Sequence, residues 1–296
     1  MPSLKDVKAK ISGVKKTRQI TKAMNMVAAS RLRGAQLAME SFRPYAGKFA
    51  EVLGSLAERA GGEAGPLIVP KEHVKKVCFV LCTSDRGLCG GFNTNAIHAA
   101  EDFVKKQKAR GVEVALVCFG KKGRDWARKN KVRIVETHLG IMGTRIPFST
   151  AAKSGQKLID SFINGDFDEI YVGYTRFVSM ARQTPVLQQL LPIPAIEKRQ
   201  EVEAATDQYL PEHICEPSAQ VLLEQLLPRS VFIMLFSALL ETSTSEHAAR
   251  MAAMDNATKA CNDMLDVLTL TYNKARQAAI TKELMDIVGG AEALKG

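Results

Sequence analysis

Residues 229–288 read RSVFIMLFSALLETSTSEHAARMAAMDNATKACNDMLDVLTLTYNKARQAAITKELMDIV, a run of 60 residues without a proline or a glycine. Proline and glycine are the residues that most strongly disfavour the interior of an α-helix. At 1.5 Å of rise per residue, one continuous helix over this run would measure about 90 Å. We therefore expect a helix that is too long to fit inside one compact domain.

A seven-residue spacing of apolar side chains predicts that this helix packs against another helix. The spacing involves Met254, Cys261, Leu268 and Ala275, together with Ala257, Met264 and Ala278, which lie three positions beyond the first, second and fourth of them. Gly289 and Gly290 follow, and we expect them to end the helix.

The first residues of the chain carry a similar pattern, after Ser3 as a candidate N-cap. Its apolar stripe steps by three and four residues through Leu4, Val7, Ile11 and Val14, and resumes with a phase slip at Ile20, Met24 and Val27. No proline occurs between these residues and Pro44. We expect one amphipathic helix, about 60 Å long over the first forty residues.

Strand and helix patterns alternate between these two segments. Strands are predicted at Lys76–Cys82, Val112–Phe119, Val132–Glu136 and Glu169–Tyr174, with helices near 93–109, 121–129 and 150–164. Such alternation indicates βαβ units and a mostly parallel sheet. The apolar stretch Pro185–Ile196 holds three prolines, so we expect an edge strand or a loop there. The two terminal helices most simply pair with each other around this inserted α/β domain.

The net charge of +10 is concentrated at one end of the chain. Residues 1–60 hold 12 Lys+Arg and 4 Asp+Glu, whereas residues 229–296 hold 7 and 8. A basic helix of this kind points to an acidic partner: nucleic acid, anionic lipid or an acidic protein surface. No Phe, Tyr or Trp precedes Phe42, which disfavours nucleic acid because single strands bind by stacking on aromatic side chains. A simple solvated basic face is the remaining alternative.

Membrane insertion is also disfavoured. The most apolar stretch, Val231–Leu240, is ten residues long, and a bilayer span needs about 20. Residues 23–39 present Ala and Met without Trp or Phe anchors, which suits close helix packing better than a membrane surface. The first ten residues contain no apolar leader segment, so we expect the protein to stay in the cytoplasm.

Enzyme-like motifs are weak. The loop TSDRGLCGG (83–91) follows a predicted strand, where open sheets bind ligands, but it matches neither phosphate-loop pattern. We favour a turn fixed by Asp85 and Arg86 over a nucleotide or catalytic site.

The six cysteines contain no CxxC pair, so reduced, buried thiols are favoured over a redox pair such as Cys82 with Cys89. The five histidines form no HExxH or HxxxH set, and we expect no metal.

Four blocks of sequence are distinctive: LKDVKAKISGVKKTRQITKAMNMVAASRLRGAQ (4–36), SDRGLCGGFN (84–93), ARMAAMDNAT (249–258) and YNKARQAAITKELMDIVGGA (272–291). Together, and in this order, they closely resemble the gamma subunit of the F-type ATP synthase. The C-terminal signature of that family is matched by Ile280, Thr281, Glu283, Asp286, Gly290 and Ala291. Ala260 and Gly289 depart from the family, which commonly has Asn and Ser there. No regulatory cysteine insert of the chloroplast type is present, so the resemblance favours a bacterial form without thiol regulation.

The resemblance implies a fold of class α/β plus all-α. A long antiparallel coiled coil of the N- and C-terminal helices (1–60 and 212–290) would carry an inserted Rossmann-like α/β domain (70–210). It also implies a function: a non-catalytic central-stalk rotor of a rotary, proton-translocating ATP synthase, coupling ion flow to conformational cycling of the beta subunits. The choice between proton and sodium lies in other subunits.

The implied partners are the alpha and beta subunits of the catalytic ring, the epsilon subunit and the c-ring. No nucleic acid and no cofactor are implied, and membrane association arises only through the complex, at the cytoplasmic face of the bacterial plasma membrane. The subunit-contact residues carried over from the family are Lys22, Met24, Arg31, Arg33, Arg250, Arg276, Gln277, Thr281 and Glu283.

Overall fold

The structure is a computed structural model that describes residues 3–59, 65–143, 145–194 and 218–293. The elements in chain order are α1 (Leu4–Arg59), β1 (Lys76–Cys82), α2 (Phe92–Ala109), β2 (Glu113–Phe119), α3 (Lys121–Lys129), β3 (Arg133–His138), α4 (Phe148–Ile163), β4 (Glu169–Phe177), β5 (Gln183–Leu191) and α5 (Ala219–Ala293). The chain divides into two compact units, which we call the helix-pair unit (Met1–Ala29 with Arg250–Gly296) and the α/β unit (Ser30–Ala249).

The sheet of the α/β unit has five strands in the order β3-β2-β1-β4-β5. The pairs β1–β2, β1–β4 and β2–β3 are parallel, and β4–β5 is antiparallel. This arrangement confirms the predicted mostly parallel sheet. It also confirms the edge position of the proline-containing stretch, because Pro185 lies in the outermost strand; residues 195–196 of that stretch lie outside the described part of the chain.

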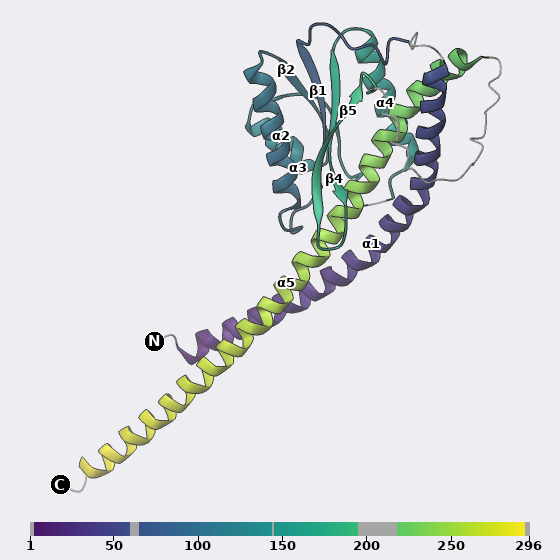
Figure 1. The fold of residues 1–296 in the computed structure, drawn as a ribbon. Helices are drawn as coiled ribbons and strands as arrows, with labels where there is room; N and C mark the ends of the chain where they lie inside the picture. The colour runs from purple at the N-terminus through teal and green to yellow at the C-terminus, as the bar shows by residue number, and fades with distance from the viewer. Residues whose placement is uncertain (1–2, 60–64, 144, 195–217, 294–296) are drawn as a thin grey trace, which may run out of the picture. The chain divides into compact units, whose positions relative to one another are not determined.

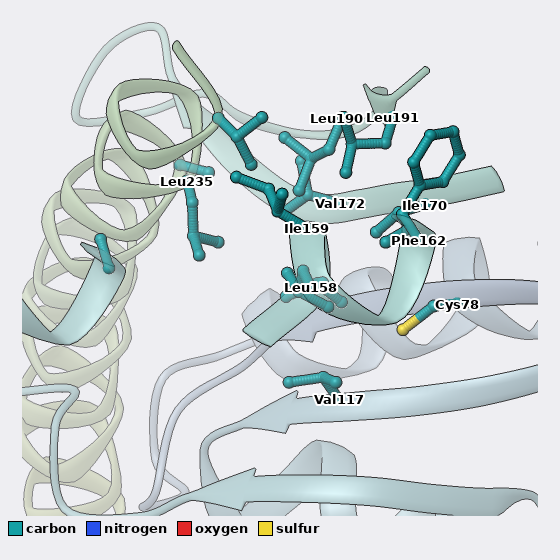
Figure 2. Packing of buried hydrophobic residues seen from close by; sticks show 14 of the residues in the cluster. Cys78, Val117, Leu158, Ile159, Phe162, Ile170, Val172, Leu190, Leu191 and Leu235 are labelled. Atoms are coloured by element: carbon teal, nitrogen blue, oxygen red, sulfur yellow. The ribbon is translucent and has the colours of Figure 1, made fainter. Parts of the chain in front are cut away.

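Helices cover both faces of the sheet (Figure 1). One face packs Phe79 and Leu116 against Ala100 and Phe103 of α2 and Ala127 of α3. The other face packs β-strand residues against α4 and against the segments of α1 and α5 that belong to this unit. Figure 2 shows this second cluster, including Cys78, Leu158 and Leu235.

The carboxylate of Asp168, just before β4, holds the residues at the beginning of β1. Its Oδ2 accepts the backbone N–H groups of Lys75 at 2.8 Å and Lys76 at 2.9 Å, and its Oδ1 lies 3.1 Å from the ammonium of Lys71. Partial burial acts to raise the pKa of Asp168, but these three donors outweigh burial and hold that pKa below its ordinary value. The ionised carboxylate therefore stabilises the folded sheet.

The apolar N-terminal part of α5 is a core helix. Leu223, Leu227, Val231, Leu235 and Leu239 are buried in one cluster at four-residue spacing. In the described residues, α5 is the one helix with an 18-residue window apolar enough to cross a membrane, at a mean hydropathy of 1.5 with 44% of the window buried. A core helix can have the same length and composition, and the apolar residues of this helix pack in the core of the α/β unit.

The start of α1 agrees with the capping residue predicted for it, whereas the end of α5 does not agree with the predicted stop. Ser3 accepts the backbone N–H of Asp6 at 3.2 Å, and its own hydroxyl donates to the Asp6 carboxylate at 2.7 Å, which confirms the predicted N-cap. The prediction that Gly289 and Gly290 end α5 is wrong, because the helix continues through both to Ala293. Glycine lowers helix propensity by about 1 kcal/mol, and these two lack the positive φ that a glycine helix stop requires.

The packing face of α1 in the helix-pair unit follows an unbroken three-four repeat. It runs through Leu4, Val7, Ile11, Val14, Arg18, Thr21, Asn25 and Ala28. The predicted phase slip is therefore wrong: Ile20 and Val27 are 61% and 53% exposed. The sequence pattern misled because polar side chains occupy the middle of the true packing face.

A similar correction applies to α5 in this unit. Its less exposed positions include Met254, Ala257, Thr258, Cys261, Leu265, Leu268, Tyr272, Ala275 and Ala279. The predicted set at seven-residue spacing is confirmed, and Ala257 of the second set is half-buried as predicted. The other two members of the second set are exposed, Met264 at 54%, and positions four residues beyond the first set are less exposed instead. Either step keeps two residues on one helix face, so the apolar side chain of Met264 favoured the wrong choice.

Candidate interaction surface

The expected contact residues on the helix pair lie mainly in solvent. Lys22, Arg276, Gln277, Thr281 and Glu283 are exposed. Met24 and Arg250 are half-buried. The hydroxyl of Thr281 donates to the carbonyl of Gln277 at 3.0 Å, which leaves its oxygen lone pairs as the group available to a partner.

The structure separates these residues into two groups along the helix pair. Arg18 contacts Asn262, and Lys22 lies one turn beyond Arg18 in the direction away from Arg276. Arg276 lies 14 residues beyond Asn262, about 21 Å along the helix axis. The residues near Lys22 and those near Arg276 therefore face different parts of any partner.

The remaining two expected contacts, Arg31 and Arg33, are exposed in the α/β unit. Arg31 lines a groove of about 820 Å³, whose other lining residues include Arg145, His247, Phe42, Phe148 and Phe236. Its Nη1 would lie 3.7 Å from a Cβ placed on Gly143, whose φ of +95° suits glycine. Arg31 thus borders a mixed polar and aromatic groove, whereas Arg33 does not line it.

An exposed apolar surface at the end of α5 was not expected from the sequence. Leu284, Met285, Ile287 and Val288 are between 56% and 68% exposed. The contact of Thr21 with Thr258 and the start of α1 at Leu4 place these residues beyond the end of α1. Four apolar residues within five positions, on several sides of a helix, are the signal that could have identified a surface covered by a partner.

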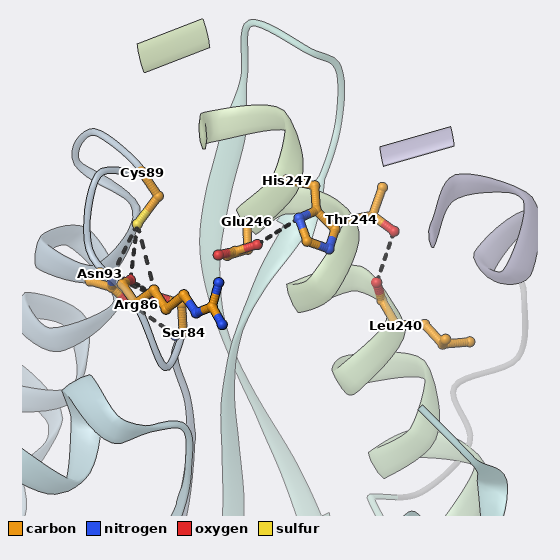
Figure 3. Close-up of polar contacts among 8 residues, drawn as sticks. All are labelled: Ser84, Arg86, Cys89, Asn93, Leu240, Thr244, Glu246 and His247. Atoms are coloured by element: carbon orange, nitrogen blue, oxygen red, sulfur yellow. Dashed lines mark hydrogen bonds and ion pairs between the residues drawn. The ribbon is translucent and has the colours of Figure 1, made fainter. Parts of the chain in front are cut away.

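The loop after β1 is a structural turn, as the sequence favoured. The carboxylate of Asp85 accepts the backbone N–H groups of Lys121, at the start of α3, and of Gly140. Asn93 bonds the backbone N–H and the hydroxyl of Ser84, and its Nδ2 lies 3.0 Å from the sulfur of Cys89 (Figure 3). Arg86 contributes through its backbone carbonyl, which accepts from Ser84.

The position where this sheet order would bind a ligand is occupied by α5. Ligands of open parallel sheets bind beyond the carboxyl ends of the strands, at the point where strand order reverses, here between β1 and β4. Cys89 and Phe92, which follow β1, bury themselves against Ala249 of α5. The hydroxyl of Ser245 donates to the carbonyl of Thr175 in β4 at 3.0 Å. This crevice therefore holds a helix of the same chain.

Polar side chains of α5 are buried where it fills the crevice. Thr242, Ser243, Thr244, Ser245, Glu246 and His247 are all at most 4% exposed. The hydroxyl of Thr244 donates to the carbonyl of Leu240, and His247 Nδ1 lies 2.8 Å from the Glu246 carboxylate (Figure 3). Glu241, one turn earlier, accepts the backbone N–H of Phe177 at 2.7 Å and pairs with Arg43 at 2.8 Å.

The described cysteines are thiols without disulfides. Cys78, Cys82, Cys89 and Cys118 are buried, Cys261 is half-buried, and Cys215 lies outside the described residues. Burial raises the pKa of both Cys78 and Cys118 to about 12, and burial raises that of Cys82 as well. Among the described residues no group of three His, Cys, Asp or Glu side chains could hold a metal ion.

Comparison with known proteins gives the same family along the whole chain. A family model described as ATP synthase matches residues 3–294. The ATP synthase gamma chain of Desulfosudis oleivorans is 62% identical over 298 residues, with 100% of both chains covered. The ATP synthase gamma chain of Nitratidesulfovibrio vulgaris strain Hildenborough is 53% identical over 296 residues, again with 100% of both covered.

Solved structures share the fold. A chain of the Euglena gracilis mitochondrial ATP synthase rotor in rotational state 1 matches with a TM-score of 0.64 at 19% identity, covering 94% of this chain and 98% of that one. A chain of the OSCP/F1/c-ring part of the same enzyme in rotational state 3 matches with a TM-score of 0.66 at 20% identity, covering 98% and 94%. Likenesses at this identity support the combination of two long helices with a Rossmann-like α/β domain.

Proposed function

The chain belongs to the ATP synthase gamma chain family, and from that premise we propose that it is the central-stalk rotor of a rotary, proton-translocating ATP synthase. Its partners would be the alpha and beta subunits of the catalytic ring, the epsilon subunit and the c-ring. The chain would hold no catalytic site of its own, and it would act at the cytoplasmic face of the bacterial plasma membrane through the complex.

One observation carries this proposal beyond family membership: the exposed apolar end of α5. Leu284, Met285, Ile287 and Val288 each leave more than half of their surface in water. Apolar surface favours burial by about 25 cal/mol per Å², so a protein sleeve around this end would stabilise the assembly. Apolar contact without fixed hydrogen bonds also allows the helix to turn inside its partner, as a rotor must.

The charged contact residues would add an angle-dependent bias. Lys22, Arg31, Arg33 and Arg276 are exposed, so each pairing with an acidic loop contributes about 0–1 kcal/mol. Several weak pairings on one side of a rotor can favour one orientation without locking it. Differential contacts of this kind are what a conformational cycle of the ring requires.

The filled crevice supports the non-catalytic part of the proposal. Ala249 packs where a Rossmann-like sheet otherwise places a nucleotide, and Asp85 is used in backbone hydrogen bonds. We expect the purified chain to hydrolyse no ATP. ATP turnover by the purified chain alone, with or without the change Asp85→Ala, would contradict this part of the proposal.

The first experiment is co-expression with alpha and beta subunits, for which we expect a stable 3:3:1 complex with ATPase activity. Hydroxyl-radical footprinting would then compare Met285 in the chain alone and in the complex. We expect Met285 to be protected on assembly while Met180, 49% exposed in the α/β unit, serves as the reference. Unprotected Met285 in a stable complex would reject the sleeve.

The second experiment tests the assigned contacts. Arg276→Ala with Gln277→Ala should lower the ATPase rate of the complex several-fold and leave the helix content of the chain unchanged. The matched control is Asn273→Ala with Lys274→Ala, two exposed neighbours on the same helix. Equal rates for the two double variants would remove Arg276 and Gln277 from the contact set.

A further inference from the structure

Two segments of the chain carry its positive charge, and one of them lies in the α/β unit. Residues 105–133 hold 11 Lys+Arg and 2 Asp+Glu, a net charge of +9 within 29 residues. Residues 1–60 hold the other excess, 12 against 4, which leaves 18 Lys+Arg and 25 Asp+Glu in all the remaining residues. The α/β unit therefore contains a strongly basic segment, although the rest of the chain outside the first helix is acidic.

The basic residues of this segment gather at the edge of the sheet where the parallel strands begin. α2 leads into β2 and α3 leads into β3, and both helices pack on one face of the sheet (Figure 1). Because β2 and β3 pair in parallel, the C-terminal ends of the two helices lie at the same edge. We call the exposed cations at these two helix ends the basic edge: Lys106, Lys108, Arg110, Arg128, Lys129 and Lys131.

The turns that follow the two helices have the same backbone construction. Val112 and Val132 each donate a backbone hydrogen bond of 3.0 Å to a carbonyl in the last turn of the preceding helix. Gly111 has a φ of +76° in the first turn, and Lys131 stands at the equivalent position of the second with a φ of +52°. Residues other than glycine are uncommon at positive φ. The second turn thus carries a cation where glycine would fit with less strain.

The basic edge is not neutralised from within the chain. Nearby ion pairs use other cations, Lys105 with Glu101 at 3.0 Å and Arg133 with Glu113 at 3.3 Å. Within the part of the chain that the structure describes, no ion pair is found for any member of the basic edge. The helix dipole favours a cation in the last turn of each helix, but three cations at each of two neighbouring ends repel one another. An anionic partner would relieve this repulsion.

The side chains of the basic edge indicate the kind of anionic partner. Between residues 104 and 133 the aromatic side chains are Phe119, which is buried, and Trp126, which is half-buried. Single-stranded nucleic acid binds by stacking on exposed aromatic side chains, so this surface suits it poorly. Four of the six residues are lysines, whose ammonium groups act as point charges rather than as two-pronged clamps. Such a surface fits a partner with dense negative charge and no fixed pattern.

We propose that the basic edge is a contact surface for anionic phospholipid headgroups. The inference rests on the proposed function, which holds the chain beside a membrane, and it adds a direct contact to the association through the complex. A fluid leaflet presents negative charge at every angle, so it attracts the basic edge without stopping a turning rotor at one orientation. Each Lys or Arg close to an anionic leaflet strengthens such binding about fivefold.

The same edge of the sheet becomes acidic toward β4, which limits the contact to the side of α2 and α3. Asp166 is exposed, and Asp168 and Glu169 are half-buried. Asp168 is held by the donors described above, and Glu169 accepts the hydroxyl of Tyr171 at 3.0 Å. An anionic leaflet would repel these carboxylates. The basic edge, and not the whole edge of the sheet, therefore faces the headgroups.

Vesicle co-sedimentation of the full chain tests the proposal. The probe is vesicles of equal parts phosphatidylglycerol and phosphatidylcholine, with phosphatidylcholine alone as the neutral reference. We expect binding to the anionic vesicles in about 0.1 M salt and release in about 0.5 M salt, where charges are screened over about 4 Å. Trp126, the single tryptophan of the chain, lies in α3, so a spin-labelled lipid headgroup should quench its fluorescence on binding.

Two variants with equal loss of charge separate the basic edge from the overall net charge. The first is Lys106→Gln, Lys108→Gln, Arg128→Gln, Lys129→Gln, which should weaken binding to the anionic vesicles by at least about 50-fold. The matched control changes four exposed lysines of α1 and should weaken binding by less than about fivefold: Lys5→Gln, Lys8→Gln, Lys10→Gln, Lys16→Gln. All eight positions are exposed, so both variants should keep the native helix content.

Several results would overturn the proposal. They are equal binding to neutral vesicles, binding without quenching of Trp126, and equal losses in the two variants. A short DNA duplex that binds the chain more tightly than the vesicles, through the same four residues, would assign the basic edge to nucleic acid instead. Assembly with alpha and beta subunits is measured without lipid, so failure of this contact and failure of the proposed function are distinguished.

Discussion

Removing the carboxylate of Glu241 should loosen α5 from the sheet of the α/β unit. Glu241 is 14% exposed at its side chain, and its two oxygens serve different partners. One accepts the backbone N–H of Phe177 at the end of β4, and the other pairs with Arg43 of α1. The change Glu241→Ala removes both contacts at once.

The two contacts differ in energy because their surroundings differ. The guanidinium of Arg43 is 54% exposed, so solvent screening limits the ion pair to about 0–1 kcal/mol. The N–H of Phe177 is part-buried, and leaving it without an acceptor costs about 1–3 kcal/mol. We expect Glu241→Ala to lower the stability of this region by about 2–3 kcal/mol and Arg43→Gln by less than about 1 kcal/mol.

Amide hydrogen exchange of the full chain tests these values at the atom concerned. A loss of about 2 kcal/mol corresponds to roughly a 30-fold faster exchange of the Phe177 amide. Arg43→Gln is the matched control, because it removes the ion pair and keeps the acceptor. If both variants change the protection of Phe177 equally, the assignment of most of the energy to the backbone contact is wrong.

Three further predictions concern other parts of the chain. Asp168→Asn should remove the part of the acid sensitivity of the sheet that this carboxylate causes. The pKa of Asp168 is lowered in the fold, so its contribution to the free energy of unfolding is complete above the unfolded value of about 3.9 and is lost as pH falls through the lower folded pKa. Acid titration followed by circular dichroism would detect the difference. Among the described cysteines, Cys261 should alkylate far faster at pH 8 than Cys78, whose pKa is about 12, and peptide mapping that finds the reverse order would contradict the burial argument. Gly120→Ala should prevent stable folding, because the new Cβ would lie 2.2 Å from a backbone oxygen at a residue whose φ is +99°. Gly111→Ala is the control: its φ is +76° and no atom lies within 4 Å of the new Cβ, so the free energy of unfolding in urea should fall by only about 1–2 kcal/mol.

The sequence predicted the long helices and the alternating α/β unit because their signals are local. Absence of proline and glycine over 229–288 and strand runs such as Lys76–Cys82 depend on neighbouring residues alone. The prediction of the packing face of the helix pair was wrong where that face depends on the partner helix. Thr21 is a polar residue, and it is buried where Thr258 of the other helix faces it. Propensity along one chain segment contains no information about such a pairing.

The candidate contacts came from family resemblance, and their roles stay predictions, as does the division at 1–60, 70–210 and 212–290. The bounds at 60, 210 and 212 fall within residues 60–64 and 195–217, which lie outside the described part of the chain. The exposed apolar end of α5 was missed because Leu284 and Met285 fit a helix repeat whether or not another helix covers them. Within the described residues, α1 begins at Leu4 and so does not extend alongside this end of α5.

The α5 segment in the crevice of the sheet also changes how that sheet can be viewed. In proteins with this strand order, a diffusing ligand occupies the same place and leaves again. Here the occupant is covalently joined to its own site, so its local concentration is fixed and dilution cannot remove it. Ser245 and Ala249 bind as a ligand would, with a hydrogen bond to β4 and an apolar contact beside Cys89. The crevice that binds ligands in other proteins with this strand order binds a helix of the same chain permanently here.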